Sequence, residues 1–131
     1  MIADSSALVA IINDEPGSDR LLEALTNAAS RRLSAATLLE ASIVADAHTD
    51  PMVSAAFDAL IDRFRFSIVP VSLQQVMIAR EAYRRYGKGS GHPARLNFGD
   101  CFAYALAKDF DEPLLYIGND FVHTDVQSAL N

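Results

Sequence analysis

Short apolar runs alternate along the chain with longer stretches in which apolar residues recur every three or four positions. The short runs predict β-strands at residues 1–4, 32–35, 67–71 and 114–117. The longer stretches predict α-helices at residues 5–13, 18–29, 36–49, 50–64, 72–86 and 97–110. Because strands and helices alternate from one end to the other, we expect an α/β fold with a short, mainly parallel central β-sheet flanked by helices.

The chain is expected to form a single domain over residues 1–131, because no linker, repeat or low-complexity segment divides it. Its residues are 50% hydrophobic and 21% charged, which excludes intrinsic disorder. No apolar run is long enough to span a membrane, and no secretory signal precedes the first strand. The single cysteine fits a reducing compartment, so we expect a cytoplasmic protein with no membrane partner.

The overall charge is acidic, with a formal net charge of -6, which at first argues against a nucleic-acid ligand. The stretch from residue 80 to residue 95 is nevertheless basic and contains a single acidic residue, Glu81. Its cationic members are Arg80, Arg84, Arg85, Lys88 and Arg95. An enzyme that binds a metal through carboxylates and keeps a basic rim would have this distribution of charge.

Three acidic residues are predicted to lie at one edge of the sheet. Asp4 ends the first strand, and Asp120 follows the last strand together with Asn119. Asp100 falls in the first turn of the last helix. Ligands of open α/β sheets bind beyond the carboxyl ends of the strands, so these side chains could converge there.

Glu40 is a fourth candidate because of its neighbours on its own helix. The residues at positions -4, +3 and +4 from it are apolar, and we therefore expect Glu40 on a core-facing stripe with Ala36, Ile43 and Val44. A buried carboxylate costs several kcal/mol unless it is paired, and no Lys or Arg lies near it on that helix. A shared divalent cation such as Mg²⁺ or Mn²⁺, which prefers carboxylate and water oxygens, would stabilise it.

Each of the four acids also has an ordinary structural interpretation. Asp4 could cap the helix that follows it, and Asp120 could be a turn residue. Asp100 could pair with Asn97 in a capping arrangement, while Glu40 could reach solvent from the edge of its helix. The combination of all four in one chain is much harder to explain in this way.

Four segments of the chain, in order, resemble the motifs of PIN-domain ribonucleases of the VapC branch, the toxins of type II toxin–antitoxin systems. The segments are MIADSSALVAI, LSAATLLEASIV, LNFGDCFAYALAK and PLLYIGNDFVHTDV. The resemblance covers almost the whole chain and implies a PIN-like fold, with Ser6 as a polar supporter of the site. It also implies that the metal-binding catalytic acids are Asp4, Glu40, Asp100 and Asp120. In the fourth motif, Asn119 or Asp125 could take the place of Asp120.

The resemblance further implies a Mg²⁺- or Mn²⁺-dependent endoribonuclease that hydrolyses RNA phosphodiester bonds and inhibits translation when it is free of its antitoxin. Asp4 and Asp100 would hold the principal ion, and Glu40 and Asp120 would hold a second ion or orient water. The five basic residues between positions 80 and 95 would contact phosphates of a structured RNA such as tRNA or rRNA. The expected partners are a cognate VapB-type antitoxin and a second copy of the chain, in a homodimer.

Other functions fit the sequence less well. A phosphatase of the haloacid dehalogenase type needs a second Asp two residues after the first, where this chain has Ser6. The three histidines lack the spacing of metal ligands, and no His adjoins Ser5 or Ser6, which disfavours a zinc site or a Ser/His hydrolase. One alternative stays open, namely a catalytically silent PIN-like scaffold that binds RNA or protein.

Overall fold

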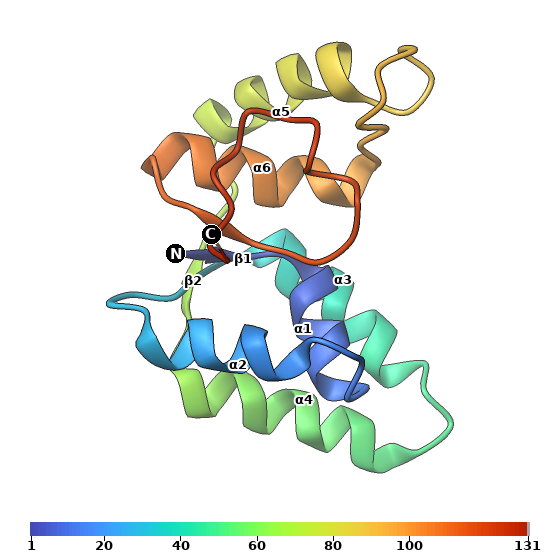
Figure 1. Ribbon diagram of the computed structural model, residues 1–131, viewed down its shortest axis with the longest axis vertical. Coiled ribbons are helices and arrows are strands. Elements are labelled where there is room, and N and C mark those ends of the chain that lie inside the picture. The colour runs from blue at the N-terminus through green and yellow to red at the C-terminus, as the bar shows by residue number, and fades with distance from the viewer. Residues whose placement is uncertain (131) are drawn as a thin grey trace.

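A parallel β-sheet lies at the centre of the computed structural model, which describes residues 1–130 (Figure 1). Its strands, in the spatial order β3-β2-β1-β4, are β1 (Ile2–Ala3), β2 (Arg32–Ser34), β3 (Ser67–Val69) and β4 (Leu114–Leu115). The helices are α1 (Ser5–Ile12), α2 (Ser18–Asn27), α3 (Ala35–Asp46), α4 (Pro51–Phe64), α5 (Leu73–Tyr86) and α6 (Phe98–Phe110). The predicted α/β class is confirmed, and every strand pairing is parallel.

Helices cover both faces of the sheet. In Figure 1, α5 and α6 lie on one face, and α1 to α4 lie on the other. Successive strand residues point to opposite faces, so each strand contributes to both sides. Ile2 and Leu114 pack with α5 and α6, whereas Ala3 and Leu115 pack with the helices of the other face. Strands β1, β2 and β4 are therefore mainly buried, whereas the edge strand β3 is largely exposed, and the strand ends are where polar side chains can gather.

Side-chain caps fix where several helices begin. Asp4 is the N-cap of α1, Asp50 of α4 and Ser72 of α5. At the start of α6, Asn97 and Asp100 form a complete capping box, in which each side chain accepts a hydrogen bond from the backbone N–H of the other. These bonds satisfy N–H groups that have no helical partner. Two of the predicted site acids, Asp4 and Asp100, are thus also helix caps.

The buried face of α3 differs from the predicted one. Its buried residues are small, namely Thr37, Ala41 and Ala45. Ile43 is 59% exposed and Val44 is 46% exposed, so the prediction that they surround Glu40 in the core is wrong. Helix α3 packs against α1 and α4 through its small residues, which allow a close approach of the helices, and its larger apolar residues consequently face solvent.

Candidate active site

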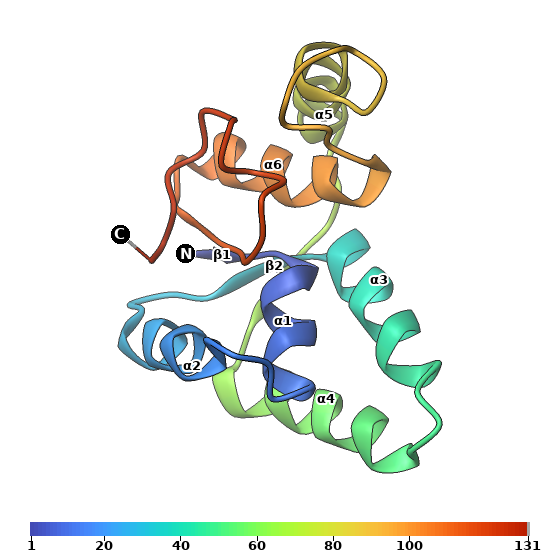
Figure 2. The same cartoon turned by 45° about the vertical axis from the view of Figure 1, so that its right-hand side comes forward.

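The four predicted acids come from segments that meet at the carboxyl end of the sheet. Asp4 follows β1 directly, Glu40 lies in the second turn of α3, and Asp100 lies in the first turn of α6. Asp120 lies in the segment that follows β4. Figure 2 shows the first turns of α1, α3 and α6 gathered at this end of the sheet. The topology therefore brings together residues that are distant in the sequence.

Asp4 is the most deeply buried of the four, with 2% of its surface exposed. Its Oδ2 atom accepts a hydrogen bond from the backbone N–H of Ser6 at 3.0 Å. Its Oδ1 atom is also buried and has no hydrogen-bond partner within residues 1–130. Burial raises the pKa of Asp4 to about 6, against the effect of hydrogen bonds from Ser6, and the charge of Glu40 adds to the rise. A buried carboxylate oxygen without a partner requires an explanation, and a bound cation would supply one.

The pKa of Asp100 is raised by the charges of the other three predicted acids. It is 7% exposed, and its Oδ2 accepts a hydrogen bond from the backbone N–H of Asn97 at 2.9 Å. Burial is the main cause that raises its pKa to about 7, and the charges of Asp4, Asp120 and Glu40 contribute in that order. Asp4, Asp120 and Glu40 therefore each lie close enough to Asp100 to disfavour its charged form. A compensating positive charge would stabilise that charged form.

Glu40 reaches this cluster from α3, although not for the reason that the sequence suggested. Its side chain is partly exposed and does not lie in an apolar core. Its carboxylate rests against Gly99, where the first turn of α6 has no side chain, and a Cβ at Gly99 would overlap the carboxylate. Gly99 is a site residue that the sequence argument missed. The available signal was a glycine inside the first turn of a predicted helix, beside a candidate acid.

The fourth position has three candidates, and the structure separates them. Asp120 is exposed and lies close enough to Asp100 to raise its pKa. Asp125 instead accepts hydrogen bonds from Tyr104 Oη at 2.6 Å and from Lys108 Nζ at 3.1 Å, so both of its oxygens are engaged away from the cluster. Asn119 is exposed and carries no charge. The geometry favours Asp120.

Ser6 connects two segments of the site. Its Oγ atom accepts a hydrogen bond from the backbone N–H of Ile117 at 3.2 Å. This bond ties the first turn of α1 to the segment after β4, three residues before Asp120. The expected supporting role of Ser6 is thus a positional one.

The donor set fits a hard divalent cation, although the side chains do not form a finished coordination sphere. Within residues 1–130, no three His, Cys, Asp or Glu side chains are spaced to hold a metal ion as they stand. Four clustered carboxylates, one of them with an unpaired buried oxygen, nevertheless match the oxygen ligands that Mg²⁺ and Mn²⁺ prefer.

The five predicted RNA-contacting residues do not join the acidic cluster. All of them are exposed, and they lie on α5 and on the loop that follows it, namely Arg80, Arg84, Arg85, Lys88 and Arg95. Arg84 pairs with Glu81 at 3.4 Å, and the guanidinium of Arg85 lies 4.8 Å from the centre of the Tyr86 ring. In Figure 2, this loop lies beside the end of α6 at which that helix begins.

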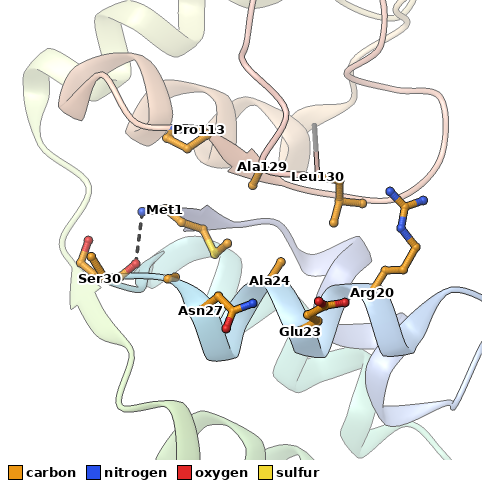
Figure 3. A pocket seen from close by; sticks show the side chains of 11 residues that line it. Met1, Arg20, Glu23, Ala24, Asn27, Ser30, Pro113, Ala129 and Leu130 are labelled. Carbon is orange, nitrogen blue, oxygen red and sulfur yellow. Dashed lines mark hydrogen bonds between the residues drawn. The ribbon is translucent and has the colours of Figure 1, made fainter.

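One hollow of the described surface lies away from the acids. It has a volume of about 560 Å³ and lies where the strands begin, beside Met1, Ser30 and Pro113 (Figure 3). Arg20 and Glu23 of α2 line the same hollow. It is thus at the opposite end of the sheet from Asp4.

Within residues 1–130, every helix is too short or too polar to cross a lipid bilayer.

Comparisons with known proteins agree with this fold. Residues 1–127 match the PIN domain family. The chain is 54% identical over 131 residues to ribonuclease VapC28 of Mycobacterium tuberculosis, covering 100% of this chain and 98% of that protein. It is 44% identical over 129 residues to ribonuclease VapC42 of the same species, with 98% of each chain covered.

Two solved structures share the architecture. One is M. tuberculosis VapC20, described as a Sarcin-Ricin loop cleaving toxin, with a TM-score of 0.76, 14% identity and 95% of each chain covered. The other is FitAcB from Neisseria gonorrhoeae, with a TM-score of 0.69, 18% identity, and coverage of 98% of this chain and 96% of that one. At these identities the two structures show the fold alone. The family match and the sequence relatives establish that this chain belongs to the PIN-domain family and, within it, to the VapC ribonucleases.

Proposed function

We propose that this chain is a Mg²⁺- or Mn²⁺-dependent endoribonuclease and the toxin of a type II toxin–antitoxin pair. The observation that carries the proposal is the cluster of four carboxylates at the carboxyl end of the sheet, where Asp4 Oδ1 is buried without a partner. The full-length relatives at 54% and 44% identity, which are named ribonucleases, support the same activity. Cleavage of cytoplasmic RNA would halt translation when the antitoxin is absent.

In this proposal, Asp4 and Asp100 hold the principal cation, and Glu40 and Asp120 hold a second ion or orient the attacking water. The bound metal would lower the pKa of a water molecule and neutralise charge on the departing oxygen. Asp4 and Asp100, with pKa values of about 6 and 7, are partly protonated near neutral pH. They would release protons as they bind the cation. No side-chain nucleophile is then needed for hydrolysis.

The exposed basic residues of α5 and its following loop are proposed to contact the RNA backbone. They lie on the α6 side of the sheet and form the rim that an acidic protein needs to hold a polyanion. These residues are Arg80, Arg84, Arg85, Lys88 and Arg95. A structured RNA such as tRNA or rRNA is the proposed substrate class.

The proposed protein partners are a VapB-type antitoxin and a second copy of the chain. Large apolar side chains are exposed on α3, α5 and α6, including Ile43 at 59% and Phe98 at 77%. An apolar groove between α5 and α6 is lined by Val76, Tyr83 and Phe102, among others. Exposed apolar surface of this extent is typical of proteins that bind other proteins.

Cleavage of total RNA tests the activity. Wild type and Asp4→Asn are incubated with Mg²⁺, with Mn²⁺ and with EDTA, and the cut sites are mapped. Asn is as good an N-cap as Asp, so the variant should keep α1 while it loses the carboxylate. We expect defined cuts by wild type with metal only, and none by Asp4→Asn. Equal cleavage by both proteins would show that the site is wrongly assigned.

The same experiment separates the enzyme from the scaffold alternative. If neither protein cleaves any RNA under these conditions, the catalytically silent scaffold becomes the better account. In cells, expression without the antitoxin should stop growth, and Asp100→Ala should restore it. Toxicity that persists in Asp100→Ala would count against metal-dependent catalysis.

A further inference from the structure

The loop between α5 and α6 has a fixed base. The backbone N–H of Lys88 donates to the carbonyl of Leu96 at 2.8 Å, and the N–H of Leu96 donates to the carbonyl of Tyr86 at 2.8 Å. Leu96 and Ala94 are almost completely buried, with 0% and 1% exposed. Backbone hydrogen bonds therefore close the base of the loop, and buried residues anchor its C-terminal end. The loop thus holds its polar side chains in fixed positions.

His92 is held in one orientation inside this loop. Its ring packs edge-on against Tyr86, with 4.9 Å between ring centres. Its Nδ1 atom accepts a hydrogen bond from the backbone N–H of Ala94 at 3.1 Å, and the backbone N–H of His92 donates to Ser90 Oγ at 3.2 Å. An Nδ1 that accepts a bond leaves the ring proton on Nε2. His92 therefore offers a hydrogen-bond donor on the free side of its ring.

These side chains surround a hollow of about 530 Å³, which we call the loop pocket. It is lined by Lys88, Gly89, Gly91, His92, Pro93 and Arg95. The lining contains two cations and an imidazole but no carboxylate. Within residues 1–130, neither Lys88 nor Arg95 forms an ion pair, unlike Arg84 on the preceding helix. The charges of the loop pocket are thus free for a ligand, in a chain whose net charge is -6.

The backbone of the loop pocket also suits a close anionic ligand. Gly89 and Gly91 have left-handed φ values of 91° and 86° and no atoms within 4 Å of a Cβ position, so the chain turns tightly and leaves open space. Arg95 has a φ of 55°, a conformation that side chains other than glycine rarely adopt. The buried residues on either side of Arg95 hold this conformation in place. Strained residues of this kind are concentrated at binding sites.

A short segment of the chain joins the loop pocket to the acidic cluster. The loop ends at Asn97, whose side chain caps α6 in the box that it shares with Asp100. Arg95 and Asp100 are five residues apart, so their Cα atoms can be at most about 18 Å apart. A single RNA strand can therefore contact both places at once.

We propose that the loop pocket is a subsite that binds a backbone phosphate of the RNA strand near the phosphate that is cleaved. Lys88 and Arg95 supply the positive charge, and His92 donates a hydrogen bond from Nε2. The proposal rests on the ribonuclease function proposed above and specifies how that enzyme positions its substrate. We expect the loop pocket to contribute more to RNA affinity than Arg84, because Arg84 is paired with Glu81.

RNA binding without cleavage tests the subsite. The affinity of a short fluorescent single-stranded RNA is measured at several salt concentrations, in an Asp100→Asn background to prevent cleavage. The loop variant is Lys88→Gln with Arg95→Gln, and the single variant His92→Gln is measured beside it. The matched control is Arg63→Gln with Arg65→Gln, which removes the same charge from exposed positions at the end of α4.

We expect the loop variant to weaken binding about tenfold and to reduce the slope of log Kd against log salt by about 0.7, the change for one phosphate contact on a single strand. His92→Gln should weaken binding about threefold, and the control should change it less than twofold. If the loop variant and the control weaken binding equally, long-range charge explains the effect and the subsite is refuted.

Two further measurements separate failure of the subsite from failure of the proposed function. Thermal unfolding must show that the loop variant is folded, and in the active chain the same substitutions should raise KM while kcat changes less than threefold. Metal-dependent cleavage by wild type with an unaltered KM in the loop variant would overturn the subsite alone. Absence of cleavage by wild type, with weaker RNA binding by the loop variant, would overturn the ribonuclease and keep the binding site.

Discussion

Replacing Asp100 by Asn should stabilise the metal-free protein at alkaline pH while it abolishes activity. The perturbation is mild in shape, because the side-chain oxygen of Asn can still accept the hydrogen bond from the N–H of Asn97 that completes the capping box. What it removes is a charge that is desolvated and repelled by Asp4, Asp120 and Glu40. Active sites commonly carry this kind of unfavourable charge for the sake of function.

The magnitude follows from the pKa of Asp100, which burial and repulsion raise from 3.8 to about 7. At about 1.4 kcal/mol for each pKa unit, the shift corresponds to roughly 4 kcal/mol of native-state cost when Asp100 is charged. Asp120 is exposed and Glu40 is partly exposed, so solvent screens part of the repulsion, and we expect about 2 kcal/mol. For a chain of this length, 2 kcal/mol raises Tm by about 7 °C.

The stability difference between the two proteins depends on pH. Between about pH 7 and pH 4 the native protein binds a proton at Asp100 that the unfolded chain does not, so its stability relative to the variant increases as the pH falls. The difference between Asp100→Asn and wild type should therefore be largest at pH 8, less than half as large at pH 5, and close to zero only below about pH 4. Urea unfolding of both proteins in EDTA at these two pH values measures it.

Addition of Mn²⁺ at pH 8 supplies the control. It should stabilise wild type and leave Asp100→Asn almost unchanged, because only wild type has the full set of ligands. A variant that is less stable than wild type by the same amount at pH 8 and pH 5 would refute the reasoning. Such a result would mean that Asp100 is mainly a structural cap.

Four other substitutions test individual contacts. Gly99→Ala should reduce activity 10- to 100-fold, because the new methyl group displaces the Glu40 carboxylate. Its stability should change by less than about 1 kcal/mol. In a Glu40→Gln background, Gly99→Ala should have no further effect on activity. Asp125→Asn should keep most of the activity and lose about 1 kcal/mol of stability, because it weakens the bonds to Tyr104 and Lys108. Asp120→Asn should lose activity and keep its stability. The reverse result would assign the fourth position to Asp125. Arg31→Ala should lower the free energy of unfolding by about 3 kcal/mol, because this guanidinium donates to backbone carbonyls at the ends of α2 and α4, and an unchanged urea midpoint would contradict that role.

Most of the fold could be predicted from the sequence because local signals and the global fold agree. The predicted starts of the helices near residues 5, 50 and 97 are confirmed, and Asp4, Asp50 and Asn97 are their N-caps. The predicted strands at 1–4 and 114–117 are longer than β1 and β4, which have two residues each. In β1 the reason is that Asp4 is the N-cap of α1, so the strand gives way to the helix at that residue.

Less of the site could be predicted, because it depends on contacts between distant segments. The sequence argument placed Glu40 in an apolar stripe, but the small residues of α3 are the ones that pack, and Glu40 instead meets Gly99 of another helix. The choice between Asp120 and Asp125 depended on where Asp125 finds hydrogen-bond partners on α6. No periodicity along one helix contains that information. The metal-binding roles of the four acids stay predictions.

Calorimetric titration with Mn²⁺ tests the central claim, that Asp4 and Asp100 share a divalent cation, most directly. Wild type, Asp4→Asn, Asp100→Asn and the control Asp125→Asn are titrated at pH 7 in two buffers with different enthalpies of ionisation. We predict that binding is at least tenfold weaker in the first two variants and unchanged in the control. The heat for wild type should depend on the buffer, because carboxyls with pKa values of about 6 and 7 release protons to the buffer as the cation binds. Equal affinity in all four proteins, with heat that is independent of the buffer, would contradict the account.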